Sequence, residues 1–117
     1  MKTPEWYWVH GLHDAKIISV IKKESDWNSA DNCLIFKIDC DGAIGESDVT
    51  EIRFYNYKIL TIDFDLNGLN GGWWLSDDLT QKGERYFLDL RFDTEKCKTK
   101  RLEIKFEKVE VIRNNYI

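Results

Sequence analysis

Apolar and polar side chains alternate along most of the chain, and this alternation predicts β-strands. In residues 32–40 the even-numbered positions from Leu34 to Cys40 are apolar, whereas Lys37 and Asp39 lie between them. The same period of two residues occupies 84–93 and 101–106. Because successive side chains of a strand point to opposite faces, each segment offers one face to a core and one to water. Such one-sided patterning is typical of antiparallel sheets.

Other segments follow the pattern with interruptions. Residues 50–66 have apolar side chains mainly at even positions, and the polar stretch YNYK divides them into strands at 50–55 and 58–66. Residues 15–24, AKIISVIKKE, are apolar at both parities, which indicates a strand covered on both faces, although a helix also fits. A further strand is predicted to begin at 73–75.

The parity of the apolar positions changes near the end of the chain. Apolar side chains occupy even positions up to Phe106 and odd positions at Val109 and Val111. A shift of one residue inside a continuous strand is what a β-bulge produces. The sequence therefore predicts a bulge near Glu107-Lys108.

Two short helical pieces are expected. Thr3-Pro4-Glu5 combines a capping hydroxyl, a proline and an acid, which predicts a short helix over 4–10. Ser76-Asp77-Asp78 could cap a single helical turn that stops at Gly83. Because no long helical segment separates the strands, parallel βαβ units are disfavoured. The predicted fold is all-β with minor α, an antiparallel β-sandwich or open barrel of six to seven strands with a short N-terminal helix.

Length, composition and charge narrow the classes of protein. The 117 residues contain one proline and no repeat, so a single domain over 1–117 is expected. A net charge of −4 disfavours nucleic acid as the main partner, because phosphate contacts need surplus Lys and Arg. The first residues hold no long apolar run, so neither a signal peptide nor a membrane span is expected. Three irregularly spaced cysteines are interpreted as reduced thiols of a cytoplasmic protein.

Residues 63–74, DFDLNGLNGGWW, begin like a calcium-binding loop. Asp63, Asp65 and Asn67 occupy its first, third and fifth positions. The twelfth position is a tryptophan, which offers no oxygen to close the cage, and the preceding segment is patterned as a strand. The preferred interpretation is a strand that ends in a hairpin turn at Asn67-Gly68. A calcium site at Asp63, Asp65 and Asn67 stays as the alternative.

The only two histidines lie close together. On one helix, His10, His13 and Asp14 would offer three metal ligands, but Gly11 interrupts that helix. Hydrogen bonds from His13 and Asp14 to backbone groups at the entrance to the first strand are the preferred interpretation. No nucleophile, phosphate-binding or dinucleotide motif occurs, so neither enzymatic activity nor a cofactor is predicted.

Tryptophans and acidic loops supply the predicted partner surface. One of Trp73 and Trp74 is expected to enter the core while the other faces out and anchors a partner or a sugar ring. The favoured alternative is that Trp6, Trp8 and this pair simply fill a small core. The candidate surface comprises Asp39, Asp41, Glu46, Asp48, Asp77, Asp78, Trp73 and Trp74.

Two stretches resemble a group of small bacterial proteins. Trp8 followed by LHDAKII, residues 12–18, is similar to an opening in which a tryptophan precedes a His-Asp-Ala-x-Ile step into the first strand. RLEIKFEKVEVI, residues 101–112, is similar to the way these domains end. Some members are immunity proteins of polymorphic toxin systems. The resemblance implies a non-enzymatic cytoplasmic protein that binds a cognate toxin, with His13 and Asp14 as a fold signature only.

Two function hypotheses follow. The first is a protein-binding module, an immunity protein whose acidic loops meet a basic toxin domain. The alternative is a small-ligand β module that binds a carbohydrate or Ca²⁺ around Asp63, Asp65, Asn67 and Trp73 or Trp74.

Overall fold

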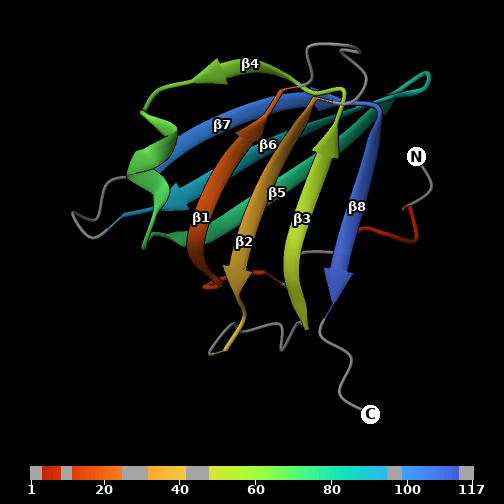
Figure 1. The fold of residues 1–117 in the computed structure, drawn as a ribbon. Coiled ribbons are helices and arrows are strands. Elements are labelled where there is room, and N and C mark those ends of the chain that lie inside the picture. The colour runs from red at the N-terminus through yellow and green to blue at the C-terminus, as the bar shows by residue number, and fades with distance from the viewer. Residues whose placement is uncertain (1–3, 9–11, 25–31, 42–47, 95–98, 114–117) are drawn as a thin grey trace.

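The computed structural model describes residues 4–8, 12–24, 32–41, 48–94 and 99–113 (Figure 1). Within them, eight strands form one open antiparallel sheet in the order β4-β7-β6-β5-β1-β2-β3-β8. The elements are β1 (Lys16–Lys23), β2 (Cys33–Asp39), β3 (Val49–Tyr55), β4 (Lys58–Ile62), the 3₁₀ helix η2 (Leu66–Leu69), β5 (Trp73–Lys82), β6 (Arg85–Asp93), β7 (Thr99–Phe106) and β8 (Lys108–Arg113). The all-β class is confirmed.

The sheet folds back on itself at the junction of β1 and β5. This ladder holds a single residue pair, Lys16 with Trp73, extended by bonds from Ile17 N to the Gly72 carbonyl and from Trp74 N to the Ala15 carbonyl. On one side of the junction, β1, β2, β3 and β8 form the front layer in Figure 1, and β5, β6 and β7 run behind them. The apolar faces of the two layers therefore meet.

Two bends carry the chain between the layers. The chain passes from β3 into β4 through Asn56, whose φ is 49°, and from β7 into β8 through Glu107. At this corner the Glu107 amide donates to the Tyr55 carbonyl at 3.3 Å. The two bent segments stay paired on both sides of the corner, with β3 against β8 and β4 against β7.

The core lies between the layers and is rich in aromatic rings. Phe36 of β2 lies at its centre, with ring centroids 5.8 Å from Phe54, 5.9 Å from Trp74 and 6.0 Å from Phe92. All four side chains are fully buried. Each such side chain stabilises the fold by roughly 1.5–3 kcal/mol relative to an exposed position. The alternating positions predicted for the strands supply most of this core.

The predicted N-terminal helix over 4–10 is wrong within the described residues. Pro4 to Trp8 form a turn closed by one bond from Tyr7 N to the Pro4 carbonyl at 3.1 Å, and 9–11 lie outside the description. The helix is displaced because the rings of Trp6, Tyr7 and Trp8 pack against the core.

The strand number is eight because the segment from 101 to 112 is two strands. The predicted bulge near Glu107-Lys108 is instead the corner between β7 and β8, which lie at different places in the sheet. Both arrangements change the parity of the apolar positions. Alternation reports which face a side chain occupies and not which strand lies beside it.

Register shifts do occur elsewhere in the sheet, and those in β1 and β5 decide which side chains enter the core. In β1 the register shifts between Ile17 and Ser19, so Ile17 and Val20 point into the core while Ile18 is 54% exposed. The expectation that β1 is covered on both faces is therefore wrong. In β5 the register shifts between Trp74 and Ser76.

The predicted helical turn at Ser76-Asp77-Asp78 is also wrong. These residues continue β5, and Gly83, with φ of 61°, lies in the turn between β5 and β6. The strand persists because nine of its residues pair with β6 across the hairpin.

The stretch DFDLNGLNGGWW leads from β4 into the start of β5 and is not a long strand with a hairpin turn. β4 ends at Ile62, and the Asn67-Gly68 backbone belongs to η2. Gly71 then takes a φ of 85°, and Gly72 passes close to two backbone carbonyls. A Cβ on Gly72 would lie 2.7 Å from the Asp93 carbonyl oxygen. The glycines therefore allow the close approach that the β1–β5 junction requires.

Gly72→Ala is expected to lower the free energy of unfolding by about 1–3 kcal/mol, because the backbone of β6 must move to admit the methyl group. Urea unfolding measures the loss. Gly71→Ala is the matched control, since a Cβ there meets nothing within 4 Å and only the positive φ opposes it. A Gly72→Ala variant as stable as wild type would contradict the steric explanation.

Candidate functional site

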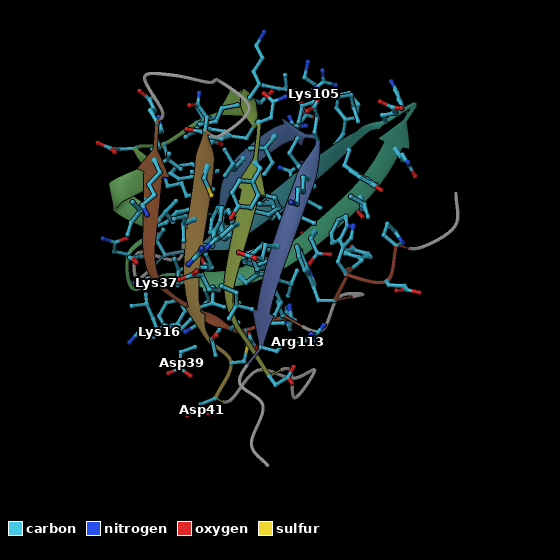
Figure 2. The ribbon with its side chains drawn as sticks, turned by 45° about the vertical axis from the view of Figure 1, so that its right-hand side comes forward. Lys16, Lys37, Asp39, Asp41, Lys105 and Arg113 are labelled. Atoms are coloured by element: carbon cyan, nitrogen blue, oxygen red, sulfur yellow. The ribbon has the colours of Figure 1, made fainter. Side chains whose placement is uncertain are left out.

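Three of the predicted acidic residues border one groove on the outer face of β1, β2, β3 and β8. Asp39 and Asp41 lie where β2 ends, and Asp48 lies where β3 begins. Figure 2 shows Asp39 and Asp41 at the same end of β2, below Lys37 and near the end of β8 at Arg113. The groove has a volume of about 640 Å³, and its lining includes Ile18, Lys37, Asp39, Asp41, Asp48 and Ile112. We call it the acidic groove.

Some charges of the acidic groove are already paired. Asp48 accepts a hydrogen bond from Arg113 at 2.6 Å. Glu51 accepts one from Arg53 at 2.5 Å, and this bond raises the pKa of the guanidinium. These ion pairs reduce the charge that the two carboxylates offer to a partner.

Asp39 and Asp41 differ from the paired acids. The Asp39 carboxylate accepts only the Asp41 amide, at 2.9 Å, and no cation lies within ion-pair distance of either carboxylate among the described residues. Lys37, exposed on the same strand, also has no ion-pair partner there. Asp39, Asp41 and Lys37 are therefore the charged side chains of the groove that have no ion-pair partner among the described residues.

The other residues of the predicted partner surface differ in whether they are exposed. Trp74 is fully buried and Trp73 is 36% exposed, so one enters the core and the other faces out, and the favoured alternative that all four tryptophans fill the core is wrong for Trp73. Asp77 is also buried, so its side chain and that of Trp74 leave the predicted partner surface. Asp78 is exposed on β5, away from the acidic groove, and Glu46 lies outside the described residues.

Asp77 holds a buried hydrogen-bond cluster that the sequence did not predict. Its carboxylate accepts the indole N–H groups of Trp8 at 2.8 Å and Trp74 at 2.9 Å, and also the hydroxyl of Tyr7. Such charge-assisted bonds compensate the removal of a carboxylate from water. The cluster, here named the Asp77 clasp, fastens the N-terminal segment to β5.

The β5 bulge turns Asp77 toward the core. In a regular strand Trp74 and Asp77 would point to opposite faces, because they are three positions apart. The shift between Trp74 and Ser76 turns both toward the core. The available signal was an acid close to paired tryptophans, together with the donors of the WYW stretch near the N-terminus.

Tyr7 keeps its proton in this cluster. Burial raises the pKa of the Tyr7 hydroxyl, and the hydrogen bond to Asp77 raises it further. The hydroxyl therefore donates to the carboxylate throughout the neutral range. The Tyr7 hydroxyl therefore acts here as a structural hydrogen-bond donor.

The His13-Asp14 pair forms the corner that leads into β1. His13 Nδ1 lies 2.7 Å from the Leu75 carbonyl, and the Asp14 amide donates to the Trp74 carbonyl at 2.8 Å. Asp14 has a φ of 68°, a conformation that aspartate tolerates better than most residues. The predicted hydrogen bonding to backbone groups is confirmed. Both side chains are exposed, and His10 lies outside the described residues.

The described residues do not assemble the set of oxygen ligands that the alternative calcium site would need. The Asp63 carboxylate accepts the Arg101 amide at 3.0 Å, which ties the end of β4 to β7. Asp65 is exposed before η2, and the Asn67 backbone lies inside that helix. Among the residues described, no three His, Cys, Asp or Glu side chains gather as metal ligands would.

Two cysteines within the description are free thiols. Cys33 begins β2 and is buried, and this burial raises the pKa of its thiol. Cys40 donates to the Val49 carbonyl at 3.1 Å. Cys97 lies outside the described residues.

No helix in the described part of the chain has the length and apolar character needed to cross a bilayer. Comparisons with protein-family models, with curated proteins and with solved structures give no match. The similarity at residues 12–18 and 101–112 thus rests on those residues alone.

Asp77→Ala is expected to lower the free energy of unfolding by roughly 3 kcal/mol, because it leaves several donors without their charged acceptor. Urea unfolding followed by tryptophan fluorescence measures this loss. Asp78→Ala, the exposed neighbour, should change stability by no more than about 0.5 kcal/mol. Similar values for both variants would refute the assigned role of the Asp77 clasp.

The clasp also predicts instability in alkali. The raised pKa means that the folded state holds the Tyr7 proton more tightly than the unfolded state does. This contribution is complete below the unfolded pKa of about 10 and is lost as the pH rises above it. Urea midpoints measured up to about pH 11 should fall less steeply in Tyr7→Phe than in wild type. If the urea midpoints of the two proteins fall in parallel as the pH rises, Tyr7 does not contribute to the loss of stability in alkali.

Proposed function

We propose that this protein is a non-enzymatic, cytoplasmic protein-binding module, an immunity protein that neutralises a cognate bacterial toxin. The observation that carries the proposal is the acidic groove. Asp39 at the end of β2, and Asp41 and Asp48 at the two ends of the connection from β2 to β3, lie at one rim of this groove. The proposed partner is a basic toxin domain.

The groove combines the two properties that a protein interface uses. Ile18 is 54% exposed and lines the groove together with Ile112, so an apolar contact area is available. Charged side chains of β2 and β3 lie between these two isoleucines, so the groove offers a partner both apolar and charged contacts. The open carboxylates of Asp39 and Asp41 would attract a basic surface and raise the rate of encounter.

Two facts from the sequence support the same proposal. The net charge of −4 favours a basic partner over an acidic one. The opening around His13-Asp14 and the closing strands resemble a group that includes immunity proteins. The corner formed by these two residues positions β1, the strand that contributes Ile18 to the groove.

The alternative, a module for a carbohydrate or Ca²⁺, has less support. Its proposed ligands include Asp63, whose carboxylate already accepts the Arg101 amide. Trp73 lines neither the acidic groove nor the second groove described below. Outside these two grooves, the exposed indole offers a sugar ring one surface to stack on.

The test is co-expression with the toxin domain encoded beside the gene, followed by binding kinetics on the purified pair. Wild type is expected to form a complex that survives size-exclusion chromatography. Asp39→Lys/Asp41→Lys should lower the association rate by about tenfold or more at low ionic strength, because steering is lost. The difference should shrink at high salt.

Asp78→Lys/Glu84→Lys is the matched control. It makes the same change in net charge at exposed positions of β5 and the β5–β6 turn. It should leave the association rate within about threefold of wild type, since only the overall charge changes. A larger effect in this control would move the interface to β5, and no complex in wild type would reject the toxin-binding proposal.

A further inference from the structure

A second groove lies between β1 and β4 and shares no lining residue with the acidic groove. Its volume is about 440 Å³. β1 contributes Val20 and Lys22, whereas β4 and the segment after it contribute most of the apolar lining. That part consists of Ile59, Ile62, Phe64 and Leu66. We call it the edge groove.

The strands beside the edge groove have unpaired backbone edges. Among the described residues, β4 pairs only with β7, so its other edge offers free N–H and C=O groups. β1 pairs with β5 only at Lys16, and the nearby backbone bonds extend no further than Ile17. The remaining length of β1, including the residues of the groove, has no ladder on that side within the description.

The free edge of β4 is unusually apolar. Leu60 is 41% exposed and Ile62 is 39% exposed, on a strand whose only charged residue is Lys58. Exposed edge strands commonly carry charges that prevent unwanted pairing. The combination of free backbone groups and apolar pockets is the one used when a peptide adds a strand to a sheet.

The local charges and the shape of β4 indicate the occupant. Lys22 lines the groove and Lys58 precedes Ile59 on β4; both are exposed and have no ion-pair partner among the described residues. Against these two cations the lining holds one carboxylate, Asp65, so a positive surplus is left for an acidic residue of a bound segment. The register of β4 shifts between Ile59 and Thr61. Such an irregularity disfavours flat edge-to-edge pairing of two copies, which need two matching straight edges.

We propose that an extended segment of a protein partner, apolar at alternate positions and carrying an acidic residue, adds to the free edge of β4. Backbone bonds to β4 hold the segment, and every second side chain enters the edge groove toward Ile59 and Ile62. This surface goes beyond the toxin-binding proposal and does not depend on it, because no residue is shared between the two grooves.

The experiment selects random peptides displayed on phage against the full chain and measures the synthesised winners by fluorescence polarisation. The expected winners alternate apolar residues and include an acid. Ile62→Lys should weaken their binding by about tenfold or more, the loss typical of a central apolar contact. N-methylation of alternate peptide amides, on the register that faces β4, should abolish binding.

Ile18→Lys is the control variant, because Ile18 is exposed in the acidic groove and absent from the edge groove. It should leave peptide affinity within about twofold. The proposal is overturned if repeated selections enrich nothing, or if the winners tolerate both Ile62→Lys and N-methylation. A dimer of wild type that Ile62→Lys dissociates would also overturn it, since a second copy would then occupy the edge.

Discussion

The fold depends on one constraint: the apolar face of the sheet must close against itself. A single sheet with one such face cannot remain flat in water, and here the junction of β1 and β5 turns it back. Gly72 makes that turn possible, because a side chain there would strike the Asp93 carbonyl. The bends at Asn56 and Glu107 complete the enclosure at the opposite corner.

Closure also explains how a carboxylate can lie inside this core. The Asp77 clasp draws one donor from β5 itself and two from the turn at the N-terminus, so the full set of bonds exists only when these two segments have met. A buried charge of this kind favours the one arrangement that satisfies it. The clasp thus links the packing of the N-terminal aromatic residues to the register of β5.

The strands were predictable because side-chain direction is a local property. Segments such as 32–40 and 84–93 show it directly, and β2 and β6 occupy most of these ranges. The order of the strands is not local, so the alternation around Glu107 was compatible with a bulge as well as with a corner. The short helix over 4–10 failed for a related reason, since contacts of Trp6 and Trp8 with distant strands outweigh a local capping pattern.

The candidate site was predictable only in part. Asp39, Asp41 and Asp48 flank predicted strand ends, and loops at strand ends are exposed. That they border one groove follows from the pairing of β2 with β3, which periodicity does not report. Asp77 was placed on the partner surface because Ser76-Asp77-Asp78 was predicted as a helical turn, whereas these residues continue β5 and the bulge turns Asp77 toward the core.

The Asp77 clasp has a consequence for the order of folding. Tyr7 and Asp77 are 70 residues apart in the chain, so their contact closes a long loop. Loops of this length form slowly relative to hairpins such as β5–β6. During synthesis, the aromatic N-terminal segment must therefore wait without its acceptor until β5 has left the ribosome, and it docks as a late event on a hairpin that is already formed.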